Sequence, residues 1–158
     1  MNVMPEGPIG QDPATFRKLA EDECWERLGH SPIGRVGWCS PRGPQILPVT
    51  IALSGHAVVF RTAAHGQMAR SIRRSVVAVE VDEIDPKTRS GWSVLVVGPA
   101  ELVGDPGEAV KLWLHHDPQP WAAGERTLFV RVRPERITGR QVGGAGDGRN
   151  RTVGTTDD

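Results

Sequence analysis

A chain of 158 residues is long enough to bury one hydrophobic core, and its acidic and basic side chains balance to a formal net charge of zero. This balance argues against the strong basicity of nucleic-acid-binding domains, and no apolar run approaches the roughly 20 residues that span a bilayer. The first 13 residues lack the basic start and apolar block of a secretory signal. We therefore expect a cytoplasmic protein with no nucleic-acid and no membrane partner.

The first predicted elements are an arm, a helix and a strand. Residues 1–13 are rich in Pro and Gly without an apolar period, so we expect a flexible N-terminal arm. Apolar residues at helical spacing predict a helix over residues 15–28. Alternating side chains then predict a strand over residues 33–40, and the PRGP segment that follows has the composition of a turn.

A β-hairpin and a short helix are predicted next. The hairpin strands are residues 45–53 and 57–62, joined by the turn residues Ser54–His56. Pro48 cannot donate a backbone hydrogen bond, so its strand is expected at a sheet edge or at a bulge. The helix is expected over residues 66–74.

Two longer strands follow the short helix. The first covers residues 75–85 and places Val77, Val79 and Val81 on one face. The second covers residues 92–103, with a bend at Gly98–Pro99. Together with the preceding hairpin, these strands predict a sheet built from neighbours in the sequence.

The last elements are a helix, one or two strands and a tail. The helix is expected over residues 107–115, because Asp105 and Pro106 are favoured at a helix start. Residues 127–141 supply the final strand or strands. Residues 142–158 are too poor in apolar side chains to form a core and are expected to be a disordered C-terminal tail.

The element pattern predicts one domain over residues 14–141, mainly β with short helices. It has about six strands and three short helices, and most strands are joined by links of hairpin length. Such links connect antiparallel strands, so we expect a small antiparallel β-barrel rather than a parallel sheet of alternating strands and helices.

Cysteine and histidine usage gives no metal site. Cys24 and Cys39 do not form a CxxC pair, and buried free thiols are expected for both. The adjacent His115 and His116 would point about 100° apart on a helix, which does not suit shared coordination of a metal ion.

The segment Phe60–Arg74, FRTAAHGQMARSIRR, is the candidate binding motif. The planar guanidinium of Arg61 suits a phosphate, and Thr62 adds a hydroxyl. Backbone amides where the helix starts near Gly66 would favour the same anion. From local sequence alone, the alternative of an exposed strand residue followed by a solvated basic helix remains open.

The order of the motifs extends this interpretation. The series ECWERL, IGRVGW, PQILPVT, AVVFRTAAHGQMA, VAVEVDEID, SGWSVLVVGPAELV, PW and ITGR resembles the pyridoxamine 5′-phosphate oxidase-like split β-barrel family. It is most similar to the compact actinobacterial branch related to nitroimidazole reductases. The resemblance covers about residues 19–141 and implies a six-stranded antiparallel split β-barrel that forms a homodimer with a flavin at the subunit interface.

The resemblance also implies which residues contact the flavin. The strand residues along the ring system would be Leu47, Pro48, Val49 and Thr50. Those at the flavin phosphate would be Arg61, Thr62, Gly66, Gln67 and Met68. Trp92 and Trp121 would come from the partner's side of the pocket. Relatives often carry Lys where this chain has Gln67 and Asn where it has Thr50; His65 and Arg70 are the nearby residues that could replace the missing cation.

The resemblance implies an FMN-dependent oxidoreductase that acts on a small organic acceptor, with no residue assigned as catalytic. One alternative is the deazaflavin coenzyme F420, whose longer anionic tail would suit Arg70, Arg73 and Arg74 on one helix face. A second alternative is a non-catalytic protein that binds flavin or haem.

Overall fold

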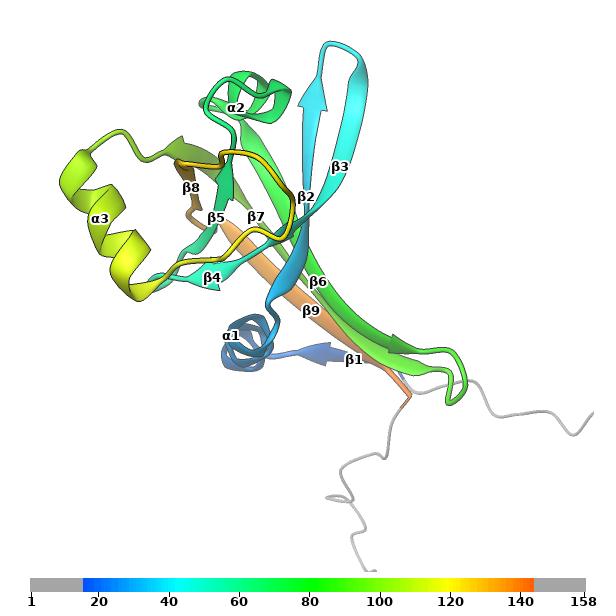
Figure 1. Cartoon of the computed structure of the whole chain (residues 1–158). Helices are drawn as coiled ribbons and strands as arrows, with labels where there is room; N and C mark the ends of the chain where they lie inside the picture. The colour runs from blue at the N-terminus through cyan, green and yellow to red at the C-terminus, as the bar shows by residue number, and fades with distance from the viewer. Residues whose placement is uncertain (1–15, 144–158) are drawn as a thin grey trace, which may run out of the picture.

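The computed structural model describes residues 16–143, in which strands predominate over short helices (Figure 1). The strands are β1 (Phe16–Leu19), β2 (Ile33–Ser40), β3 (Gly43–Thr50), β4 (Ala52–Leu53), β5 (Val58–Thr62), β6 (Val76–Asp85), β7 (Ser90–Leu102), β8 (Leu128–Val132) and β9 (Arg136–Val142). The helices are α1 (Glu21–His30), α2 (Gln67–Ile72) and α3 (Pro106–His115). The predicted arm and most of the predicted tail lie outside the described residues.

All strand pairs are antiparallel, as predicted. The strand order is β3-β2-β6-β7-β8-β5-β4, and β9 pairs with both β7 and β1. β3 is at one end of this order, which confirms the edge position expected from Pro48. In Figure 1 the long β6–β7 hairpin extends to one side, while α2 and α1 lie at opposite ends of the molecule.

Nine strands are present among the described residues, whereas about six were predicted. The predicted helix at 15–28 was wrong at its start. Phe16–Leu19 form a strand paired with β9, and the helix begins after Ala20, whose backbone N–H donates to the Glu23 carboxylate at 2.7 Å. The strand predicted over 45–53 divides at Ile51, whose N–H donates to the Pro32 carbonyl instead of to a strand partner.

β7 connects the two halves of the sheet. Its residues up to Pro99 pair with β6, whereas Ala100–Leu102 pair with β8. Gly98 and Pro99, where a bend was predicted, are the last residues of the segment that pairs with β6. A Cβ on Gly98 would stand 1.9 Å from the Arg133 carbonyl oxygen, so only glycine allows the chain from β8 to β9 to approach β7 this closely.

The core lies on the apolar faces of these strands. Val77, Val79 and Val81 of β6 are buried, while Val76 on the opposite face is exposed, as the alternation predicted. A smaller cluster joins α3 to the sheet and contains Val59, Val103, Leu112 and Phe129.

α2 is shorter than the predicted helix over 66–74. It ends at Ile72 after burying Met68, Ala69 and Ile72. Arg74 has a φ of 59°, which breaks the helical backbone before β6. No helix within residues 16–143 is long and apolar enough to cross a membrane.

We expect Gly98→Ala to destabilise the fold by about 3 kcal/mol or more, since its methyl group would overlap the Arg133 carbonyl. Urea unfolding followed by circular dichroism measures this change. Gly104→Ala is the matched control, because a Cβ there meets nothing within 4 Å, and we expect a change within about 1 kcal/mol. Equal stability of the two variants would contradict the role given to Gly98.

The two cysteines should differ in reactivity. Cys24 is buried, as predicted. Cys39, on strand β2, is exposed, so the prediction that it is buried was wrong. Burial, followed by the nearby Glu23 carboxylate, raises the pKa of the Cys24 thiol. Since the thiolate is the reactive form, a disulfide reagent should modify one thiol rapidly in the native protein and two after unfolding. Cys39→Ser should remove the rapid phase; its persistence would show that Cys24 is accessible.

Candidate binding cleft

A cleft of about 850 Å³ lies between β3, the end of β5, the start of α2 and the loop that joins α3 to β8. This volume falls within the range of small-molecule sites. Ten of the twelve predicted flavin-contact residues line it: Leu47, Pro48, Val49, Thr50, Arg61, Thr62, Gly66, Gln67, Met68 and Trp121. Segments separated by some 70 residues in the sequence are thus gathered into one site.

The two remaining predicted residues lie elsewhere. His65 is exposed and does not line the cleft, and its carbonyl accepts a hydrogen bond from Arg70. Trp92 lies in the first half of β7, where the guanidinium carbon of Arg27 stands 4.7 Å from its ring centroid. Within one chain, Trp92 borders a separate groove formed by the end of β6, the start of β7 and the end of β9.

β3 forms the apolar wall of the cleft. It pairs with β2 along one edge, so its other edge carries backbone groups that no neighbouring strand of the described sheet satisfies. Ile46 and Leu47 are 70% and 47% exposed. Exposed apolar side chains beside an open strand edge are suited to a flat, partly polar ring system.

Arg61 lies at the opposite wall, at the end of β5, and is largely buried. Its Nη1 donates to Asp117 at 3.0 Å and its Nε donates to the carbonyl of Arg126 at 2.8 Å. Its guanidinium carbon also stands 4.1 Å from the centroid of the Trp113 ring. Arg61 therefore joins β5 to both ends of the α3–β8 loop.

A third contact fixes the same loop. The Thr50 hydroxyl donates to the carbonyl of buried Pro118 at 2.9 Å, which connects the end of β3 to the loop. The loop then carries Pro120 and Trp121 along the cleft, and Trp121 is 82% exposed. In Figure 1 this loop crosses in front of β5 on its way from α3 to β8. It is a wall of the cleft in its own chain.

Two further cleft residues were not predicted as ligand contacts. Trp38 of β2 lines the cleft and is buried, and Arg126 lines it from the end of the loop. The Nε1 atom of Trp38 and the Nε atom of Arg126 are both buried without a hydrogen-bond partner. Trp38 also belongs to the hydrophobic core, and Arg126 has no local motif; only the fold shows that both reach the cleft.

The cleft has a positive charge balance. Arg61 and Arg126 are the two charged residues that line it among the described residues, and Asp117 compensates only the first of them. The cleft can therefore accept an anionic group at its β5 end and an apolar ring along β3. Within residues 16–143, no cluster of three or more His, Cys, Asp or Glu side chains could hold a metal ion.

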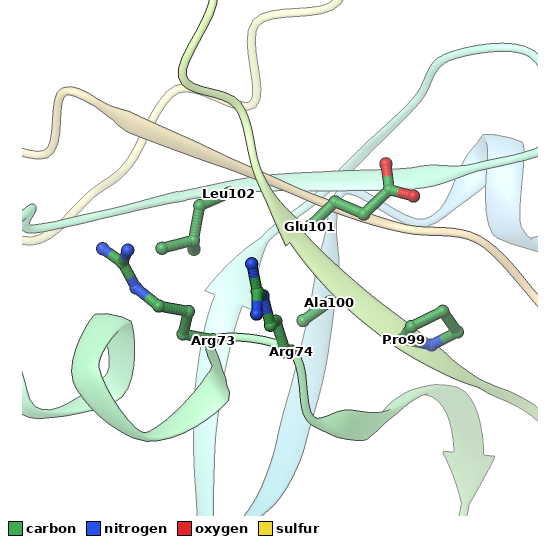
Figure 2. A pocket seen from close by; sticks show the side chains of 6 residues that line it. All are labelled: Arg73, Arg74, Pro99, Ala100, Glu101 and Leu102. Carbon is green, nitrogen blue, oxygen red and sulfur yellow. The ribbon is translucent and has the colours of Figure 1, made fainter.

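A second groove, of about 730 Å³, lies on β7 next to the end of α2. Figure 2 shows Arg73 and Arg74 on one side of it and the β7 segment Pro99–Leu102 on the other. Glu101 on this segment pairs with Arg131 and Arg133 rather than with these two arginines. The groove has neither an open strand edge nor an aromatic wall, so it fits a ring system less well than the first cleft.

Comparison with known proteins assigns the fold to a family. The model of the pyridoxamine 5′-phosphate oxidase family matches residues 20–141. The Mycobacterium tuberculosis protein Rv0080, itself uncharacterized, is 32% identical over 149 residues, which are 88% of this chain and 95% of that protein.

Two solved structures have the same fold. The FAD binding protein from Mycobacterium smegmatis superposes with a TM-score of 0.66 at 28% identity, covering 79% of this chain and 97% of that protein. A Corynebacterium glutamicum protein, provisionally described as a pyridoxamine 5′-phosphate oxidase, has a TM-score of 0.69 at 30% identity and covers 84% and 96%. These matches confirm the predicted split β-barrel, and the chain belongs to the pyridoxamine 5′-phosphate oxidase-like family.

Proposed function

We propose that the protein binds a phosphorylated flavin, FMN in the first instance, in the β3–β5 cleft. It then acts as a flavin-dependent oxidoreductase on a small organic acceptor. The observation that carries this proposal is the cleft itself, which combines an apolar open strand edge with two arginines and no acidic lining residue among the described part of the chain. The relationship to the M. smegmatis FAD binding protein supports it.

The flavin ring would lie along β3. Leu47, Pro48 and Val49 offer apolar side chains, and the open strand edge offers backbone groups that can pair with the polar rim of the ring. Trp121 and the loop would exclude water from this end. Thr50 acts indirectly, because its hydroxyl is engaged by Pro118 and holds the loop in place.

The phosphate would lie at the β5 end. Thr62 and the start of α2 line this end of the cleft, through Gly66, Gln67 and Met68. His65 does not line the cleft, and only its position next to Gly66 keeps it a candidate phosphate contact. The flavin supplies the redox chemistry when bound, while the chain's residues bind, orient and shield it, so no side chain is assigned as a catalytic acid or base.

A homodimer is part of the proposal. Ile46, Leu47 and Trp121 expose apolar surface at the cleft mouth, and a second copy of the chain could cover it. Trp92, which lies outside the cleft of its own chain, would then be available to the pocket of the partner.

FAD is the second candidate cofactor, since the M. smegmatis relative at 28% identity is described as an FAD binding protein. The deazaflavin alternative gains no separate support from the basic residues in α2 and directly after it. Arg70 donates to the His65 carbonyl, while Arg73 and Arg74 border the groove of Figure 2 instead of the cleft.

The purified protein should carry or take up a flavin, seen as a flavin absorption spectrum and identified by mass after release. Leu47→Asp should weaken flavin binding at least tenfold, because it places a charged carboxylate in the apolar wall along which the flavin ring would lie. Fluorescence titration with FMN measures the dissociation constant.

Val110→Asp is the matched control, since Val110 is similarly exposed but lies on α3 and does not line the cleft. Equal effects of the two variants would place the flavin elsewhere. A wild-type protein that binds neither FMN nor FAD would contradict the proposed function. One that binds flavin but never transfers electrons to a small acceptor would be a flavin carrier.

A further inference from the structure

The two arginines of the cleft do not have the same freedom to bind a ligand. Arg61 already donates to Asp117 and to the carbonyl of Arg126, and its guanidinium stacks over Trp113. Its charge is compensated by a largely buried carboxylate. A phosphate would have to compete with these contacts to recruit Arg61.

The side chain of Arg126 forms no such ion pair, hydrogen bond or stacking contact within residues 16–143. It lines the cleft, and its Nε atom is shielded from water without a hydrogen-bond partner. No ion pair to Arg126 is formed within residues 16–143. Arg126 is thus a half-buried cation that lines the cleft without an ion-pair partner, so its guanidinium is suited to an anionic acceptor supplied by a ligand.

A second unpaired donor lies in the same cleft. Trp38 is only 5% exposed, and its indole Nε1 has no acceptor in the described structure. Buried indole N–H groups usually find a partner. Trp25, which lies outside the cleft, has a third such donor, so the assignment below is carried by the place of Arg126 in the cleft and by its unpaired charge.

We propose that Arg126 is the residue that holds the phosphate of the flavin, and that Arg61 and Asp117 are positioning residues that fix the loop carrying it. This inference rests on the proposed flavin-binding function. It also assigns a cation to the end of the cleft where Gln67 is neutral, whereas neither His65 nor Arg70 lines the cleft. A guanidinium can give a phosphate two parallel hydrogen bonds, which suits this role.

The test compares FMN with riboflavin, which differ by the phosphate alone, by fluorescence titration of the full chain. The wild type should prefer FMN. Arg126→Gln should weaken FMN binding by about ten- to a hundredfold and leave riboflavin binding unchanged, because a charge-assisted hydrogen bond to the phosphate is lost. Arg126→Lys should keep part of the preference for FMN. Arg73→Gln, in the separate groove of Figure 2, should keep all of it.

The double variant Arg61→Gln/Asp117→Asn separates the two roles of arginine, because it removes the ion pair without changing the net charge of the cleft. If Arg61 positions the loop, this variant should weaken FMN and riboflavin to the same degree and leave the ratio of their affinities unchanged. If Arg61 were the phosphate ligand, the variant would lose the preference for FMN, which would overturn the inference. Thermal unfolding of each variant shows that it is folded.

The other outcomes are equally decisive. An Arg126→Gln protein that keeps its preference for FMN, or that loses FMN and riboflavin equally, overturns the assignment of Arg126. A wild type that binds both flavins with equal affinity retains the proposed function but refutes the phosphate contact. A wild type that binds neither flavin refutes the proposed function and the inference together.

Discussion

The close approach of the Arg133 carbonyl to Gly98 is the constraint on which the binding cleft depends. It lets one strand, β7, pair with β6 and β9 before the bend and with β8 after it. β3, which forms the apolar wall of the cleft, is connected to β7 through β2 and β6. β5, which carries Arg61 on the basic wall, is connected to β7 through β8. A single backbone contact therefore positions both walls, although it contributes no atom to the cleft.

Polar contacts of the α3–β8 loop complete the site. The loop has little apolar burial of its own, and its placement depends on Thr50 from one wall and Arg61 from the other. The Arg61–Asp117 pair is largely withdrawn from solvent, so it holds its geometry better than exposed pairs such as Arg17–Glu23. The same contacts leave Arg126 as the cleft's unneutralised cation among the described residues.

Sequence patterns predicted those parts of the fold that depend on neighbouring residues. The alternation around Val79 and the edge position of Pro48 each follow from local geometry. Phe16 was misassigned because its spacing to Leu19 suits a helix, whereas pairing with the distant β9 makes this segment a strand. Motif order led to segments that line the cleft. It could not identify Arg126 or the partner of Arg61, since both depend on a loop some 60 residues away.

A crystal structure of the protein grown with FMN would show whether a flavin ring lies on the open edge of β3 with its phosphate beside Arg126. We expect electron density for the ring along Leu47–Thr50, with the phosphate in hydrogen-bond contact with Arg126 while the Arg61–Asp117 pair stays intact. Density for FMN in another groove, such as that of Arg73 and Arg74, or a phosphate held by Arg61 after release of Asp117, would contradict this expectation.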